Sequence, residues 1–441
     1  MVYYQGLECF DLQIESLLKP LRNCPCGKSH TVGIRDVQIG RGLLPDTARI
    51  LRENRFPTNI LVVSGTRSFA AADGIMDVLQ NGGFSVRLHI FDGVHTSHQS
   101  DVDAIVSLCD GVDGLLFIGT GSLGDVCRRA CYVADKEFAI FATAPSMDGF
   151  ASDTAPITIH NFKISLPARE PSVIIADTDI LAAAPSVLRS AGFGDIMGKA
   201  IGLADWKIGA LTTGEYYCEN VASLTREAYR SVCAAADRIP QSDPESAGIL
   251  MRALVVTGMA MKLCGSSRAA AGAEHVVSHC WEIKTLEAGR TTAYHGKKVG
   301  VAALMITRMY YDLCEKADPS RFGADETDWN RVYAFYGDLF SPDVRKCNNP
   351  SVTDETSAQI LREKWSAICD AVHEEMPSPA VLEDLLRRAG AAMTAREIDI
   401  SPELCLGGLE FHPYMRHRML LSRLVPMLHC ETDYPKWAGI S

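Results

Sequence analysis

Short apolar runs alternate with helix-like stretches along the first 180 residues. The runs are rich in β-branched and aromatic residues, which is typical of strands buried on both faces of a parallel sheet. The clearest runs are NILVVSG (59–65), SVRLHIF (85–91), GLLFIG (114–119), FAIFATAP (138–145) and SVIIAD (172–177). Because helix-like stretches such as 71–83 and 101–109 separate them, the pattern predicts an α/β domain with a parallel sheet. The stretch 31–42 alternates apolar and polar residues and predicts an edge strand.

The pattern changes after residue 180, where helical periodicity dominates and strand signals are few. The helix-like stretches cover residues 182–211, 223–239, 246–264, 297–317 and 356–372. We therefore predict an α/β domain over residues 1–180 and an all-helical domain over residues 181–441. The most apolar long stretch, 248–264, contains Arg252 and Lys262, and we expect it to be too short and too charged to span a membrane.

The composition is that of a globular protein and narrows the possible functions. Of the 441 residues, 47% are hydrophobic and 22% are charged, which excludes a disordered or fibrous chain. The formal net charge of −11 argues against a nucleic-acid or anionic-membrane partner. The 15 cysteines lie mostly within apolar runs, and the N-terminus has no basic region leading into an apolar stretch. We therefore expect a cytoplasmic protein with reduced thiols and a catalytic cleft between two domains.

The sequence GTGSLGD (119–125) follows one of the predicted strands and opens a helix. Gly119, Gly121 and Gly124 match G-x-G-x-x-G, in which glycines and the helix N-terminus let backbone amides approach a phosphate. The motif lies on a late strand and no acidic residue ends a strand about 20 residues later, so it departs from the usual dinucleotide fingerprint. A tight strand-to-helix turn is the alternative interpretation.

The next strand runs into TAPSMDGFAS (143–152), where small hydroxyl residues follow its carboxyl end. In a parallel sheet this end faces the crevice in which ligands bind. Asp148 precedes Gly149 and is either a ligand contact or an ordinary turn residue. Two such loops on neighbouring strands together favour a ligand site.

Side chains suited to a metal lie in the helical half of the chain. Asp195 lies on a predicted helix, and His295 begins a later one. His275 and His279 are four residues apart and therefore share one helical face. A carboxylate and two or three imidazoles from separate helices suit Zn²⁺ or a related divalent ion. The alternative is a set of buried histidines with a helix-capping aspartate.

A second zinc-like motif, CPCGKSH, places Cys24, Cys26 and His30 near the N-terminus. A structural zinc needs four ligands, and its cysteines are usually spaced as C-x2-C. The sequence shows no partner pair for these residues. We therefore expect them to have a structural or incidental role.

Taken in order, six motifs resemble the sn-glycerol-1-phosphate dehydrogenase family in its bacterial form. They are GTGSLGD, TAPSMDGFAS, IIADTDIL, GFGDIMGKAIGLADWKIG, GAEHVVSH and HGKKVG, and the similarity runs from about residue 30 to about residue 425. The family belongs to the superfamily of dehydroquinate synthase, glycerol dehydrogenase and iron-containing alcohol dehydrogenases. The resemblance implies a dehydroquinate synthase-like fold, in which a Rossmann-like parallel sheet precedes an all-α domain.

The resemblance also implies roles for individual residues. The pyrophosphate of NAD(H) or NADP(H) would lie against Gly121, Ser122, Leu123, Gly124 and Asp125, with further cofactor contacts from Thr143, Ser146 and Ser152. One divalent metal would be bound by Asp195, His275 and His295, with Zn²⁺ expected and Ni²⁺ or Fe²⁺ as alternatives. Asp148 and His279 would be catalytic, and together with Asp195 they would bind the substrate. Thr120 replaces a glycine that is frequent in the family's turn.

The implied reaction is the reversible reduction of dihydroxyacetone phosphate to sn-glycerol 1-phosphate, with the metal as Lewis acid and the nicotinamide as hydride donor. Lys199 and Lys207, near the predicted metal site, are candidates for binding the substrate phosphate, and the alternative is that either one is a solvated surface lysine. The resemblance also implies a homodimer or larger homo-oligomer. The alternatives are a dehydrogenase of glycerol or another small polyol, a dehydroquinate synthase-like lyase, and a non-catalytic nucleotide-binding protein.

Overall fold

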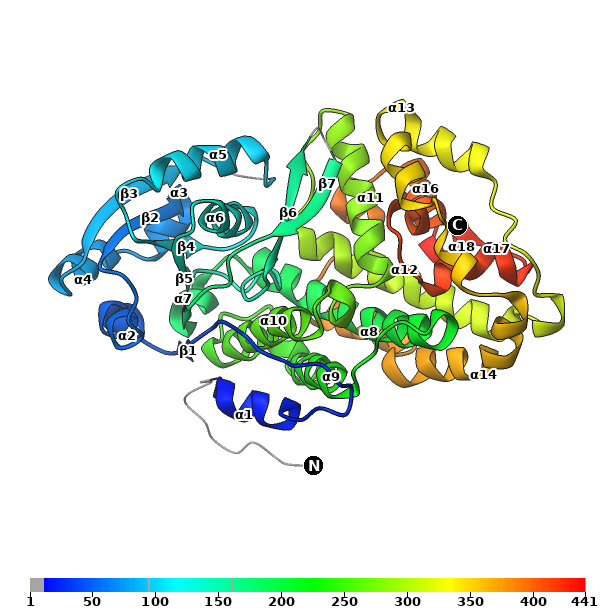
Figure 1. Cartoon of the computed structure of the whole chain (residues 1–441), viewed down its shortest axis with the longest axis horizontal. Helices are drawn as coiled ribbons and strands as arrows, with labels where there is room; N and C mark the ends of the chain where they lie inside the picture. The colour runs from blue at the N-terminus through cyan, green and yellow to red at the C-terminus, as the bar shows by residue number, and fades with distance from the viewer. Residues whose placement is uncertain (1–11, 94–95, 160–161, 441) are drawn as a thin grey trace.

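The computed structural model of the chain describes residues 12–93, 96–159 and 162–440. A six-stranded sheet occupies one end of the molecule and helices fill the other (Figure 1). Its strands are β1 (Asp36–Gly40), β2 (Asn59–Gly65), β3 (Ser85–Phe91), β4 (Gly114–Gly119), β5 (Glu137–Ala142) and β8 (Val173–Asp177). All neighbouring pairs are parallel, in the order β1-β8-β5-β4-β2-β3. The predicted fold class is confirmed.

The apolar pattern locates the strands closely, and the central strands β2 and β4 are buried on both faces as predicted. The prediction was wrong for 85–91: β3 forms the other edge of the sheet, and its residues are half-buried or exposed. β2, β3 and β4 have the predicted bounds, and β1 lies at an edge as expected. Along β2, Leu61 and Val63 enter one core, whereas Ile60 and Val62 enter another. Helices α5 (Gln99–Leu108) and α6 (Ser122–Val133) contribute to the first core; α2 (Thr47–Glu53) and α4 (Ile75–Asn81) contribute to the second. Two short helices, α3 (Thr66–Ala71) and α7 (Thr178–Ala183), follow β2 and β8.

An antiparallel hairpin, which the sequence pattern did not predict, follows β5. It pairs β6 (Thr154–Ile159) with β7 (Phe162–Pro167). The hairpin lies between α6 and α11 (Ala273–Glu287), the helix that carries two of the predicted site histidines (Figure 1). It therefore joins the sheet part of the molecule to the helical part.

The rest of the chain is helical, as predicted. The helices after α7 are α8 (Ser186–Thr213), α9 (Glu219–Ala234), α10 (Pro244–Cys264), α11, α12 (His295–Lys316), α13 (Trp329–Cys347), α14 (Ala358–Glu375), α15 (Pro379–Arg388), α16 (Pro402–Phe411), α17 (Val425–Leu428) and α18 (Tyr434–Ala438). Helices α8 and α12 approach closely because glycines meet at their crossing. A Cβ added to Gly300 would lie 3.0 Å from the Cα of Gly194.

Helix α10 corrects one expectation. By length and composition it could cross a membrane, so the apolar stretch is neither too short nor too charged by that criterion. However, 78% of its most apolar window is buried inside the protein. A helix that is apolar all round is typical of a core position in a large protein.

The segment before β1 packs on the helical part. Helix α1 (Ile14–Leu18) buries none of its own residues. Leu21 and Cys24 join an apolar cluster with Trp206 of α8 and Val221 of α9. In Figure 1 this dark-blue segment runs beside α9 before it enters the sheet. The segment between residue 12 and β1 therefore packs on the helical part before it joins the sheet.

Candidate active site

The glycine-rich turn lies where the sheet topology reverses. From β2 the chain moves outward to β3, and it then returns to place β4 on the other side of β2. In open α/β sheets, ligands bind at such a point, in the crevice outside the carboxyl ends of the strands. The turn follows β4 and leads directly into α6. This position fits a dinucleotide site better than a plain connection.

Two glycines of the turn are required by its geometry, for different reasons. Gly121 has a φ of +72°, and a Cβ added there would meet no atom within 4 Å, so the space beside it is open. Gly124 lies against the ring of Phe117, where an added Cβ would approach to 3.0 Å. Ser122 and Leu123 form the first turn of α6 with it. Open space at a helix N-terminus suits a phosphate.

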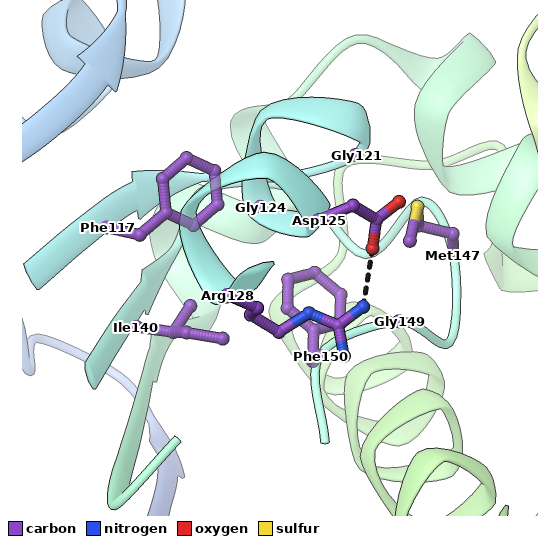
Figure 2. Close-up of a pocket in the computed structure, with 9 residues that line it drawn as sticks. All are labelled: Phe117, Gly121, Gly124, Asp125, Arg128, Ile140, Met147, Gly149 and Phe150. Carbon is purple, nitrogen blue, oxygen red and sulfur yellow. Dashed lines mark hydrogen bonds and ion pairs between the residues drawn. The ribbon is translucent and has the colours of Figure 1, made fainter. Parts of the chain in front are cut away.

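Asp125 attaches the glycine turn to the following loop. Its buried carboxylate accepts a hydrogen bond from Arg128, whose Nη1 donates to the Ser152 carbonyl at 2.6 Å (Figure 2). Asp125, Arg128 and Gly149 line a small cavity. The Ser152 hydroxyl lies 3.2 Å from the hydroxyl of Thr154. Both predicted cofactor contacts, Asp125 and Ser152, thus have partners within the protein, and direct contact with the cofactor stays a prediction.

Thr143 and Ser146 lie beside the same turn. The Thr143 amide donates to the Gly119 carbonyl at 3.2 Å. The hydroxyls of Thr120 and Ser146 are 2.7 Å apart. The structure therefore brings together the two loops that the sequence predicted to bind a ligand, 119–125 and 143–152. The side chain of Thr120 links them.

The loop after β5 also reaches α8. The Asp148 amide donates to Asp195 Oδ2 at 3.0 Å. Lys199 Nζ donates to Asp148 Oδ2 at 2.7 Å and to Asp195 Oδ1 at 2.6 Å. All three side chains are buried. Gly192 permits this approach, since a Cβ there would lie 2.0 Å from the Pro145 carbonyl oxygen.

Lys199 sets the charges of this network. Burial alone would lower its pKa, but Asp148 and Asp195 outweigh burial and raise the pKa above its usual value. Burial would raise the pKa of Asp195, but the Lys199 ammonium holds it far below its usual range. Burial and the neighbouring Asp195 raise the pKa of Asp148. A charged ammonium therefore faces a charged carboxylate at Asp195 across the physiological range.

Asp195, His275 and His295, which we call the Asp195 cluster, meet from three helices. Their ligand atoms all lie within 4.8 Å of one another. They come from α8, α11 and the first residue of α12. Asp195 and His275 are buried, whereas His295 is partly exposed. A carboxylate and two imidazoles with one accessible side form the kind of donor set that catalytic metal sites use.

Glu274 orients His275, a role that the sequence analysis did not assign. Glu274 Oε1 lies 2.6 Å from His275 Nδ1 and accepts the Gly272 amide at 3.0 Å. The other ring nitrogen, Nε2, is 3.4 Å from Asp195 Oδ1. A carboxylate on one ring nitrogen fixes the tautomer that presents the other nitrogen to a metal. Burial and Lys199 would lower the pKa of His275, but Asp195 and Glu274 raise it to about 9.

Asp205, three residues after Gly202 on α8, supports helix α11. Its carboxylate accepts hydrogen bonds from the Ala273 amide at 2.8 Å, the Leu421 amide at 3.0 Å and the Tyr310 hydroxyl at 2.8 Å. Since Ala273 is the first residue of α11, this contact holds the end of the helix that carries His275. The DW pair of the motif therefore has a positioning role.

His279 lies next to the Asp195 cluster. Its ring centroid is 5.7 Å from that of His295 and 6.4 Å from that of His275. Burial and the positive charge of Lys163 hold the pKa of His279 well below its usual value. His279 is therefore a neutral imidazole that can accept or donate a hydrogen bond.

A group of cations that the sequence analysis missed lies beside His279. Lys163 of β7 and Lys298 of α12 each donate to Glu282 at 2.7 Å. Arg416 donates to the Lys163 carbonyl at 2.9 Å. Lys163 and Arg416 both lower the pKa of His279, so positive charge lies beside this imidazole. Positive charge suits an anionic group of a substrate.

The two lysines suggested for the substrate phosphate are placed differently. Lys199 is fully buried between Asp148 and Asp195. Lys207 lies at the surface and pairs at 2.7 Å with Glu374, whose side chain is 62% exposed. That suggestion was therefore wrong: one lysine is committed to two carboxylates, and the other pairs with a surface glutamate.

Comparisons with known proteins define the class of fold. A family model described as iron-containing alcohol dehydrogenase matches residues 38–185. An alcohol dehydrogenase of a Red Sea brine pool archaeon has a TM-score of 0.60 at 14% identity, covering 93% of this chain and 97% of that chain. A probable glycerol dehydrogenase from Sinorhizobium meliloti has a TM-score of 0.54 at 16% identity, covering 91% and 93%. The fold is that of the iron-containing alcohol dehydrogenases.

Proteins related in sequence identify the family within this fold class. The glycerol-1-phosphate dehydrogenase (NAD(P)+) of Geobacillus stearothermophilus is 28% identical over 421 residues, covering 93% of this chain and 96% of the relative. The enzyme of the same name from Methanosarcina acetivorans is 33% identical over 279 residues, covering 63% of this chain and 76% of the relative. The chain belongs to the glycerol-1-phosphate dehydrogenase family, which confirms the resemblance drawn from its motifs.

Proposed function

We propose that the protein is an NAD(P)-dependent sn-glycerol-1-phosphate dehydrogenase that reversibly reduces dihydroxyacetone phosphate with the help of one divalent metal. The observation that carries the proposal is the Asp195 cluster, which is joined by Asp148 to the loop bordering the glycine turn. The names of the relatives supply the substrate and the cofactor. The active site then lies between an α/β domain (1–180) and a helical domain (181–441).

The donor set fits a divalent ion, with Zn²⁺ expected and Ni²⁺ or Fe²⁺ as alternatives. One carboxylate and two imidazoles suit these metals, and Glu274 supports His275 from behind. Both oxygens of Asp195 already accept hydrogen bonds, but a carboxylate has about four lone-pair positions and can bind a metal as well. When bound, the ion would act as a Lewis acid toward the substrate carbonyl.

The residues around the metal donors bind the cofactor, bind the substrate and transfer a proton. The amides of the glycine turn would hold the pyrophosphate of NAD(P)H, whose nicotinamide would supply the hydride. Asp148, held in place by Lys199, accepts a hydrogen bond from a substrate hydroxyl. His279 is neutral and partly exposed, so it can hold or pass the proton that the product alcohol gains.

The substrate phosphate binds the cations around Glu282. A phosphate would be repelled by Asp148 and attracted by the positive charge of Lys163, Lys298 and Arg416. Lys298→Met should raise KM for dihydroxyacetone phosphate about tenfold or more and change kcat less. Lys297→Met is the matched control, because Lys297 Nζ is bonded to the Glu397 carbonyl. Equal KM values in the two variants would contradict this placement.

The direct test follows oxidation of NADH and NADPH by the metal-loaded protein with different acceptors. We expect dihydroxyacetone phosphate to be reduced far faster than dihydroxyacetone, and an enantiospecific assay should find the sn-1 product. A preference for dihydroxyacetone would support a polyol dehydrogenase instead. Absence of oxidation with both ketones would contradict a dehydrogenase and favour a lyase or a non-catalytic protein.

A further inference from the structure

A second set of metal donors lies outside the active site. Cys24, Cys26, His30 and Cys218, which we call the cysteine cluster, have ligand atoms that all lie within 4.8 Å of one another. The first three come from the loop before β1, and Cys218 directly precedes α9. Cys218 is the fourth ligand that the sequence did not reveal. We propose that this cluster is a structural zinc site with three thiolate ligands and one imidazole ligand.

The distances match the edges of a tetrahedron around zinc. With bonds of about 2.3 Å to sulfur and about 2.0 Å to nitrogen, two sulfurs lie about 3.8 Å apart, and a sulfur and a nitrogen about 3.6 Å apart. Cys24 Sγ and Cys218 Sγ are 3.5 Å apart. His30 Nε2 is 3.1 Å from Cys26 Sγ and 3.7 Å from Cys218 Sγ. Small shifts of side chains would therefore complete the coordination.

His30 is oriented as a zinc ligand should be. Its Nδ1 lies 2.7 Å from the carbonyl oxygen of Leu263. A carbonyl only accepts hydrogen bonds, so Nδ1 carries the hydrogen and Nε2 presents its lone pair to the sulfurs. The side chain is buried, which holds this orientation.

Polar groups around the cluster point at the sulfurs and donate to them. The Tyr216 hydroxyl donates to Cys26 Sγ at 3.3 Å, and the Lys28 amide donates to the same sulfur at 3.5 Å. Asn220 Nδ2 donates to Cys24 Sγ at 3.3 Å. Donors aimed at sulfur stabilise thiolates, which are the form that binds zinc. A disulfide between two of the cysteines would have little use for these hydrogen bonds.

The site would be structural and not catalytic, because four protein ligands complete the tetrahedral coordination and leave no position for a substrate. It would join two segments that are 194 residues apart, the loop at Cys24 and the start of α9 at Cys218. Trp206 packs in the same apolar cluster. It lies eleven residues after Asp195 on α8, which is about 16 Å along that helix.

The test is elemental analysis of the purified full-length protein together with two cysteine variants. We expect about two metal ions per chain in the wild type. Cys218→Ser should lose one equivalent of zinc. Cys264→Ser should lose none: Cys264 is buried in the same apolar cluster, but its thiol donates to the Ser266 carbonyl at 2.8 Å. Unchanged zinc in folded Cys218→Ser protein, or a wild type with no zinc beyond the active-site ion, would overturn the proposal.

A second measurement does not depend on the cysteine variants folding. The variant His275→Ala removes a ligand of the Asp195 cluster, so its remaining metal reports on the cysteine cluster alone. X-ray absorption at the zinc edge should show about three sulfurs at about 2.3 Å and one nitrogen. Zinc bound only by nitrogen and oxygen, no bound zinc, or a Cys24–Cys218 disulfide found by mass spectrometry would each overturn the proposal.

Discussion

The Asp195 cluster and the cysteine cluster are both groups of metal donors, but they are built differently. The Asp195 cluster offers three nitrogen and oxygen donors, and His295 is partly exposed. The cysteine cluster offers four donors, three of them thiols; His30 and Cys218 are buried, whereas Cys26 is partly exposed. Oxygen and nitrogen donors with an accessible side let a substrate reach the metal, whereas thiols that fill the tetrahedron do not. By this comparison, the Asp195 cluster is suited to catalysis and the cysteine cluster to a structural role.

The surroundings of the two clusters differ in charge as well. Around Asp195 the neighbours are buried ionisable side chains: Lys199 is bonded to Asp148 and Asp195, and Glu274 is bonded to His275. Around the cysteines the neighbours that donate hydrogen bonds are neutral, the hydroxyl of Tyr216 and the amide of Asn220. Substitutions that alter charge near Asp195 should therefore change the reaction rate, and substitutions in the cysteine cluster should change stability.

The largest effect should come from His275→Ala. It removes one of three metal donors, and a Lewis acid stabilises the transition state by several kcal/mol, so kcat/KM should fall by more than about 1,000-fold. Circular dichroism should show an intact fold, because His275 contributes little to the apolar core. Activity within tenfold of the wild type would show that the metal is not bound where we place it.

A smaller loss of rate should follow from Asp148→Asn. The amide keeps the size of the side chain but cannot neutralise Lys199 or accept a charge-assisted hydrogen bond from the substrate. The loss should be on the order of 2–3 kcal/mol, or roughly 30- to 150-fold in kcat, with NADH affinity nearly unchanged. Asp153→Asn is the control, since that carboxylate in the same loop pairs with Lys262 at 3.1 Å. Equal rates in both variants would remove Asp148 from the catalytic set.

Gly121→Val should weaken NADH binding and leave both clusters intact. The side chain would fill the open space beside the turn, and the Kd should rise about tenfold or more, equivalent to about 1.4 kcal/mol. The backbone strain of a positive φ must be separated from this effect. Gly214→Val is the control, because Gly214 has a φ of +73° and open space around it but lies at the end of α8. Calorimetry that finds equal Kd values in both variants would make the turn merely structural.

The centre of the fold could be predicted closely because its strands are buried on both faces. The runs at 59–65 and 114–119 coincide with β2 and β4, since a central parallel strand has no solvent face to interrupt its apolar residues. The run at 85–91 coincides with β3, but this edge strand is half-buried or exposed. The β6–β7 hairpin was missed. Its strands alternate apolar and polar residues over only six positions each, and Pro156 and Pro167 lie within them, which weakens the strand signal.

The sequence could predict those active-site residues that lie in short motifs, but not those that meet only when distant segments fold together. Asp195, His275 and His295 were identified from short motifs, but Lys163 and Arg416 lie on segments 253 residues apart and meet only in the fold. Cys218 was missed for the same reason, since 188 residues separate it from His30. Glu274 had a signal, a carboxylate directly beside a ligand histidine in the motif GAEHVVSH, to which the sequence analysis assigned no role.

The smallest effect on catalysis should come from Cys218→Ser, and its consequence should appear in the N-terminal segment. Helix α1 buries none of its own residues, so the segment depends on the cysteine cluster and the apolar contacts around it. Without the zinc, trypsin should cleave faster after Arg22 and Lys28, both of which are exposed, while activity stays within about twofold. Mass spectrometry of the fragments would locate the cuts, with Cys264→Ser as control. Cleavage at these sites that is no faster than in the control would show that apolar packing alone holds the segment, and a large loss of activity would show that the two clusters are coupled through α8.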